Sequence, residues 1–202
     1  MFTKLEITCA LVFVFSILHI ANAGDPDILT DFVAPNTTID ANYFTFTGLR
    51  QLVGGVYPTT FEAIKVSVNE FPALDGLSVS YAVLQFPSGS VNPVHIHPRP
   101  SELLFLIFGT LQVGFVDTNH TLFKQTLQLG DMFVFPKGLV HFQYNNDTKE
   151  PALAVSAFGS ANAGTQSIPT SVFNTSIFEG ILEASFHAKR ATIRKIEDGL
   201  KA

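Results

Sequence analysis

Nine short strand-like segments follow one another between residues 61 and 158, and they constrain the fold more than any other feature. Some alternate apolar and polar residues, as in FEAIKVSV from Phe61, and others are continuous apolar runs, as in ELLFLIF from Glu102. Both patterns are typical of β-strands, and glycine, proline and asparagine mark the turns between them. Many short strands at such intervals predict an all-β sandwich or barrel, with residues 59–160 as its core.

The flanking sequence differs in pattern. Residues 24–58 show little periodicity and are predicted to form an extended N-terminal arm. Residues 161–202 begin with a connector rich in Thr, Ser and Pro, after which apolar residues recur at helical spacing in two stretches, 176–186 and 188–200. These stretches predict two C-terminal α-helices. No internal repeat is visible, so we expect one barrel unit.

Residues 1–23 have the organisation of a secretory signal peptide. Lys4 precedes an apolar run from Ile7 to Ile20, and Ala21-Asn22-Ala23 offers a cleavage site. The run is shorter than the roughly 20 residues that span a bilayer, so a membrane anchor is the weaker interpretation. Cleavage after Ala23 would leave 202 − 23 = 179 residues, one domain's length. The single cysteine, Cys9, would be removed with the peptide, which predicts a mature chain without disulfides.

Charge and glycosylation motifs narrow the class of protein further. The formal net charge of −5 argues against nucleic acid or an anionic membrane as a partner. Asn-x-Ser/Thr motifs in a secreted chain are candidate glycosylation sites. They occur at Asn36, Asn119, Asn146 and Asn174.

Three histidines and one glutamate form a candidate metal site. His95 and His97 are two residues apart, so on a strand their side chains point to the same face. Glu102 follows a proline-rich bend and begins a strongly apolar segment, where a carboxylate is costly to bury without a partner. His141 comes 39 residues later, after a second turn, and is expected from a neighbouring strand. The alternative is that these are unrelated surface or core residues.

The ligand types bear on the metal. Structural zinc sites favour closed sets of Cys and His, whereas imidazole, carboxylate and water suit harder or redox-active ions. Three imidazoles and one carboxylate leave two positions of an octahedral ion open for water, substrate or dioxygen. We therefore expect Mn(II) or Fe(II), with Zn(II) as a further alternative.

Two gapped motifs carry a family resemblance. Gly89-x5-His95-x-His97-x4-Glu102-x6-Gly109 and Gly130-x5-Pro136-x-Gly138-x2-His141-x3-Asn145 resemble the two cupin boxes of plant germins, and the similarity extends over nearly the whole chain. The resemblance implies a jelly-roll β-barrel with one cupin domain, a manganese ion, and secretion to the apoplast or cell wall. It also implies C-terminal helices that interlock monomers into a hexamer, a trimer of dimers. The alternative is that these helices cover the apolar surface of the monomer's own barrel. Many germins carry an N-terminal Cys pair that this chain lacks.

The resemblance implies two redox activities, which the residues favour unequally. Germins proper are oxalate oxidases, and some germin-like proteins dismutate superoxide. Asn92 matches one substrate-binding asparagine of the oxidases, but Ala82 stands where they place a second. Alanine offers no hydrogen bond, so we predict little or no oxalate oxidase activity. Superoxide dismutation requires little more than a redox-active ion and a small access channel, and it remains a hypothesis.

Non-catalytic interpretations stay open. The chain would then be a metal-binding structural, storage-like or receptor-type glycoprotein. For the secreted manganese protein, the resemblance implies a role in plant defence or the cell wall. A hydrolase is less favoured, because no catalytic triad or cysteine nucleophile is apparent. His120 and His187 stand alone in the sequence and are expected to be solvated.

Overall fold

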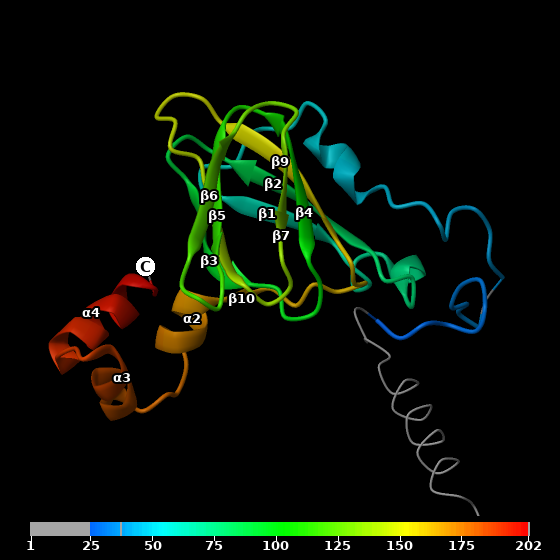
Figure 1. The fold of residues 1–202 in the computed structure, drawn as a ribbon. Helices are drawn as coiled ribbons and strands as arrows, with labels where there is room; N and C mark the ends of the chain where they lie inside the picture. The colour runs from blue at the N-terminus through cyan, green and yellow to red at the C-terminus, as the bar shows by residue number, and fades with distance from the viewer. Residues whose placement is uncertain (1–24, 37, 202) are drawn as a thin grey trace, which may run out of the picture.

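The computed structural model describes residues 25–36 and 38–201, and its centre is a barrel of two antiparallel sheets (Figure 1). The predicted signal peptide and Cys9 lie outside these residues. Each sheet has five strands. In the first sheet the order is β1 (Glu62–Val66), β2 (Ser80–Phe86), β9 (Ala152–Phe158), β4 (Glu102–Phe108) and β7 (Met132–Phe135). In the second it is β10 (Gln166–Ser167), β3 (Val91–Ile96), β8 (Val140–Tyr144), β5 (Leu111–Val116) and β6 (Leu122–Leu127).

All nine segments predicted as strands form strands, which confirms the all-β jelly-roll barrel. The tenth, β10, has only two residues and pairs with the edge of β3. Its sequence carries no alternation long enough to detect, and the pairing with β3 alone makes it a strand.

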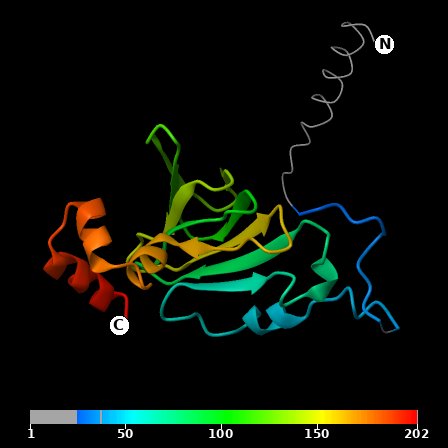
Figure 2. The ribbon, with the colours of Figure 1, turned by 90° about the horizontal axis from the view of Figure 1, so that it is seen from below.

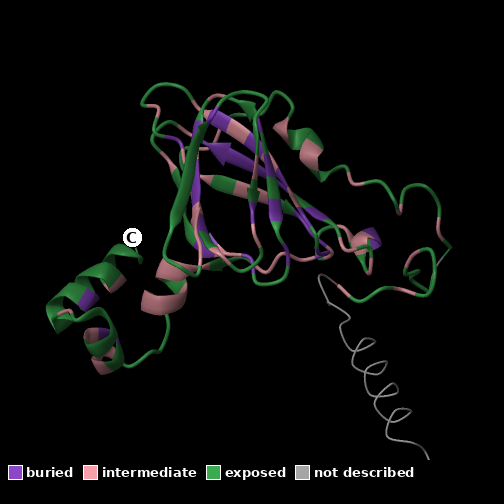
Figure 3. Cartoon of the chain, viewed as in Figure 1, coloured by how far each residue is buried: buried purple, intermediate pink, exposed green. Residues whose placement is uncertain are grey.

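The core lies between the two sheets, because each strand turns its alternate residues inward. In β4, Leu104 and Leu106 are fully buried, whereas Leu103 and Phe105 point outward and are exposed. Figure 3 shows the buried positions concentrated inside the barrel. The core cluster consists of Ala82, Leu84, Phe86, Leu104, Leu106, Leu111, Val113, Leu127, Phe135, Ala152, Ala154 and Phe158.

The predicted arm has no strand within its described residues and contains one short 3-10 helix, η1 (Gly48–Leu52). A second, η2 (Pro72–Leu74), lies between β1 and β2. Near its end the arm is tied to the barrel by the Tyr57 hydroxyl, which donates a hydrogen bond of 2.6 Å to the carbonyl oxygen of Ala152. The arm and the C-terminal helices lie on opposite sides of the barrel (Figure 2).

Three helices follow the barrel: α2 (Ile168–Phe173), α3 (Glu179–Phe186) and α4 (Arg190–Gly199). The last two confirm the predicted helices, each two or three residues shorter at its start. His187 adopts a left-handed conformation, with φ of 49°, and ends α3. The prediction missed α2, which has six residues and whose Ser167 cap accepts a hydrogen bond from the Thr170 N–H. Within the described residues, no helix has the length and apolar character needed to cross a membrane.

Candidate metal centre

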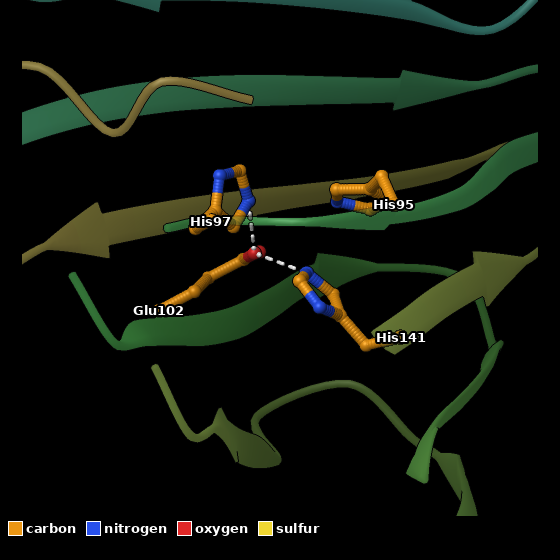
Figure 4. Close-up of side chains that lie close together, drawn as sticks. All are labelled: His95, His97, Glu102 and His141. Atoms are coloured by element: carbon orange, nitrogen blue, oxygen red, sulfur yellow. Dashed lines mark hydrogen bonds and ion pairs between the residues drawn. The ribbon is translucent and has the colours of Figure 1, made fainter. Parts of the chain in front are cut away.

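The two sheets bring the four predicted ligands together inside the barrel (Figure 4). His95 lies on β3 directly opposite His141 of β8, and His97 follows the end of β3. Glu102 is the first residue of β4 in the facing sheet, and it enters the same space after the proline-rich bend. The carboxylate therefore approaches the imidazoles from across the barrel, as the spacing of the motif predicts.

The donor atoms converge closely enough to share one ion. One donor atom from each of the four side chains lies within 4.8 Å of the others. The Nε2 atoms of His97 and His141 are 3.0 and 3.3 Å from Oε2 of Glu102. All four residues are between 1% and 4% exposed, so their charge and polarity are almost wholly shielded from water.

Hydrogen bonds at Nδ1 orient the histidine rings. His95 Nδ1 is 2.7 Å from the carbonyl oxygen of Pro93, and His141 Nδ1 is 2.8 Å from that of Leu139. A carbonyl oxygen only accepts, so each Nδ1 carries the proton and each Nε2 of the neutral ring has a free lone pair. Nδ1 of His97 contacts the hydroxyl of Thr165 at 3.4 Å. Two of the three rings are thus held in the tautomer that binds a metal through Nε2.

Two buried polar residues orient the carboxylate of Glu102. Its Oε1 accepts hydrogen bonds from the Ser156 hydroxyl at 2.6 Å and from the Gln143 amide at 3.2 Å. Gln143 in turn accepts a hydrogen bond of 2.6 Å from the side-chain amide of Asn92. With Oε1 occupied, Oε2 is the atom that faces the histidines.

The sequence analysis missed Ser156 and Gln143. Both are fully buried, and each sits at an inward-facing position of a strand whose other inward residues are apolar or are ligands. Gln143 follows His141 by two residues, so period-2 alternation places it on the same face. A polar residue at an inward position was the signal that could have revealed them.

Burial and contacts shift the acid–base behaviour of this group. Burial raises the pKa of Glu102, but the close contacts of its Oε2 with the Nε2 atoms of His141 and His97 outweigh burial and lower the pKa to about 2. Burial, together with the neighbouring charge of His141, lowers the pKa of His95 to about 4. A neutral imidazole and an ionised carboxylate are the protonation states that bind a cation.

A pocket of about 430 Å³ opens onto this group, and His95, His97 and Glu102 form part of its lining. Asn92 and Ala82 line the same pocket. The predicted substrate contact, Asn92, thus shares this pocket with the alanine that stands where the oxidases have a second asparagine. Ala82 is 4% exposed. The aromatic rings of Phe135 and Phe158 pack on the histidines, with centroids 4.6 Å from His141 and 4.8 Å from His97.

A loop from residue 162 to 165 forms one side of the pocket. Arg99 holds this loop by donating to both the backbone carbonyl and the side-chain oxygen of Asn162. Gly164 has a φ of 66°, and a Cβ there would meet the Arg99 guanidinium, so the close approach requires glycine. The loop that forms this side of the pocket is therefore fixed in place by side-chain contacts.

The remaining predicted residues lie away from this centre. Asn36, Asn119, Asn146 and Asn174 are exposed. His120 and His187 are also exposed, at a turn and a helix end, and neither lines the pocket.

Comparisons with known proteins agree with the geometry. The Cupin family model matches residues 54–194. Germin-like protein 9-3 of Oryza sativa is 50% identical over 187 residues, which cover 88% of this chain and 87% of that protein. Germin-like protein 9-1 of the same species is 47% identical over 203 residues, covering 98% and 82%.

A solved structure of recombinant oxalate oxidase in complex with glycolate is 26% identical, with a TM-score of 0.76. The match covers 87% of this chain and 97% of that one. The family model covers well over half of the chain, and the relatives are matched over most of their own length. The chain is therefore a germin-like member of the cupin family.

Proposed function

We propose that this protein is a secreted, Mn(II)-binding germin-like protein that dismutates superoxide. One observation carries the proposal: three imidazoles and one carboxylate converge within 4.8 Å at the inner end of a pocket. Glu102 supplies a hard oxygen donor and the histidines supply borderline nitrogen donors, a set suited to Mn(II) or Fe(II). Zn(II) is the alternative without redox chemistry.

The chain's own residues define what the site would do. Bound Mn(II) would supply the one-electron oxidation and reduction that convert two superoxide ions and two protons into dioxygen and hydrogen peroxide. Ser156 and Gln143 hold Glu102 so that its Oε2 faces the histidines, and this oxygen would bind the ion together with the three imidazoles. The pocket of about 430 Å³ gives a small anion access to the metal-binding group.

Oxalate is a poor fit for the same pocket. Ala82 gives a methyl group where the oxalate oxidases place an asparagine, and the amide of Asn92 already donates to Gln143. A dianion at the metal would therefore find fewer hydrogen-bond donors, and binding polar groups without partners costs affinity. We expect little or no oxalate oxidation.

A second candidate is a structural metal site in a storage-like or receptor-type glycoprotein. The near-complete burial of all four donors, 1% to 4% exposed, favours it, because structural sites are closed to solvent. The two candidates differ in whether the bound ion exchanges water and changes oxidation state.

We also propose a localisation and an assembly, both of which the family resemblance supports. The predicted signal peptide supports secretion to the apoplast or cell wall, and the exposure of Asn36, Asn119, Asn146 and Asn174 supports glycosylation there. We propose a homo-oligomer, a hexamer built as a trimer of dimers, in which the apolar residues of α3 and α4 meet neighbouring subunits.

The test is metal analysis and activity on the same secreted sample. We expect about one manganese per chain, superoxide dismutase activity and no oxalate oxidation. His95→Ala should lose metal and activity, whereas His120→Ala, which alters an exposed histidine outside the pocket, should lose neither. Manganese without dismutase activity would favour the structural site, and wild-type metal content in His95→Ala would contradict the ligand assignment.

A further inference from the structure

Lys65 is a cationic residue in the lining of the pocket that opens onto the metal-binding group. Its strand, β1, turns Phe61, Ala63 and Lys65 toward the pocket, while Glu62 and Ile64 face a different depression on the other side of the strand. Lys65 is thus on the pocket face of the sheet, although its long side chain is exposed to solvent.

The register places Lys65 beside the alanine that distinguishes this pocket. Lys65 and Ala82 are directly opposite each other on β1 and β2, and residues so paired have Cβ atoms about 5 Å apart. The small alanine leaves room beside the lysine. The position that lacks a polar side chain is therefore directly opposite a residue that carries an ammonium group.

An acidic residue close to this ammonium group is Glu70, whose pKa is lowered mainly by a hydrogen bond from Ser67 and further by the charge of Lys65. Among residues 25–36 and 38–201, Lys65 takes part in no ion pair. Glu70 also lines the pocket, but its carboxylate accepts two hydrogen bonds from Ser67, from the N–H at 2.9 Å and the hydroxyl at 2.6 Å. Those bonds hold Glu70 at Ser67, so Lys65 is available to an anion in the pocket.

We infer that Lys65 binds the distal carboxylate of a dicarboxylic acid longer than oxalate, whose other carboxylate lies at the metal-binding group. This inference rests on the proposed metal site and names a ligand class for it. The pocket's volume of about 430 Å³ is within the range of small-molecule sites and exceeds the needs of a two-carbon diacid. The lining includes the apolar residues Phe61, Ala63, Leu84 and Phe158 among its polar ones, and these give a methylene chain apolar surface to contact.

The two ends of the pocket would thus bind different carboxylates of the same ligand. A monocarboxylate of the same length would reach the metal-binding group but would leave the ammonium group of Lys65 without a partner. A diacid would satisfy both ends, and its preferred length would report the span between them. Lys65 is a specificity-determining residue in this scheme and makes no contribution to holding the metal.

The test is calorimetric titration of manganese-loaded protein with malonate, glutarate and adipate, and with butyrate as the monoacid. We expect at least one diacid to bind the wild-type chain. Lys65→Met should weaken that diacid by about 10- to 100-fold, the range for a lost charge-assisted hydrogen bond, and leave butyrate unchanged. Lys65→Arg should restore most of the affinity. Lys149→Met removes an equal charge from the exposed loop before β9 and should have no effect.

The outcomes separate this inference from the proposed function. Metal content and the binding of azide, a small anion that needs only the metal, are measured on every variant. If Lys65→Met keeps its metal, binds azide and binds the diacid as tightly as wild type, the role of Lys65 is wrong while the metal site stands. If the wild-type chain binds no diacid, the ligand class is wrong. A wild-type chain without metal contradicts both proposals.

Discussion

The barrel interior and the C-terminal helices use charged and apolar residues in opposite ways. Inside the barrel, Glu102 and His141 are buried, and no buried side-chain polar atom of the described residues lacks a hydrogen-bond partner. On the helices, Arg190 and Arg194 form ion pairs with glutamates at the solvent-exposed surface. Apolar side chains there are exposed instead, and Phe178 is 70% exposed.

The difference shows how each part of the chain uses its apolar residues. The barrel buries an apolar core and satisfies its buried polar groups, although its outer face also exposes large apolar residues, among them Phe105, Met132 and Val134. The helices bury only Leu182 and Ile193 and leave an apolar surface uncovered. That surface supports the proposal that the helices pack on neighbouring subunits.

The largest effect is expected from Glu102→Gln, which removes the buried charge at the centre of the barrel. Metal affinity should fall by more than about 100-fold, because even loss of an orienting partner costs 10- to 100-fold. Ser156→Ala is the matched variant: it keeps the carboxylate but removes its 2.6 Å hydrogen bond, and it should give the smaller loss. Metal titration of both proteins checks the order, and equal losses would contradict it.

Core packing should give the next effect. Leu104 is fully buried, so Leu104→Ala should lower the free energy of unfolding by about 2–5 kcal/mol through lost burial and the cavity that remains. The neighbouring Leu103 points outward and is 43% exposed, so Leu103→Ala should cost far less. Denaturant unfolding of the metal-free proteins measures both, and similar losses would show that the two faces of β4 are not distinct.

Acid should destabilise the metal-free barrel through His95. Its pKa is lowered from 6.5 to about 4, so between these values the unfolded chain binds a proton that the folded chain does not. The free energy of unfolding is therefore unaffected by protonation of His95 above pH 6.5, and it falls by roughly 3 kcal/mol as the pH falls from 6.5 toward 4. Glu102 adds a second, lower window, from 4.5 toward 2. Unfolding followed by circular dichroism should show a shallower dependence between pH 6.5 and 4 in His95→Ala than in wild type.

The exposed apolar surface of the helices should matter for assembly more than for folding. Ile181 is 57% exposed, so Ile181→Ser should weaken the oligomer while leaving metal content and the barrel's unfolding unchanged. Ile193 is fully buried, and Ile193→Ser should instead disrupt the helices themselves. Sedimentation and metal analysis distinguish the two. An unchanged oligomer in Ile181→Ser would remove this residue from the interface.

The smallest effect is expected from the ion pairs on the helices. Arg194 donates to Glu179 at 2.9 Å, but both side chains are solvated and the attraction is screened by salt. Arg194→Ala should shift the unfolding temperature little, and high salt should erase even that shift. A large, salt-independent loss would mean that this pair is buried in the assembled protein.

The sequence alone determined the nine main strands, the last two helices and the four convergent side chains. Its periodicity and turn residues depend on local physics, and the spacing of His95 and His97 follows from the strand repeat. The two cupin boxes related His95 to His141, which are 46 positions apart in the sequence, as ligands of one site.

Only the tertiary structure decided what surrounds the ligands. Ser156 and Gln143 reach Glu102 because strands distant in sequence pair beside it and face one another across the barrel. Lys65 meets Ala82 through the register of β1 and β2. These contacts arise from long-range pairing, whose register depends on packing the whole core, and no local pattern encodes them.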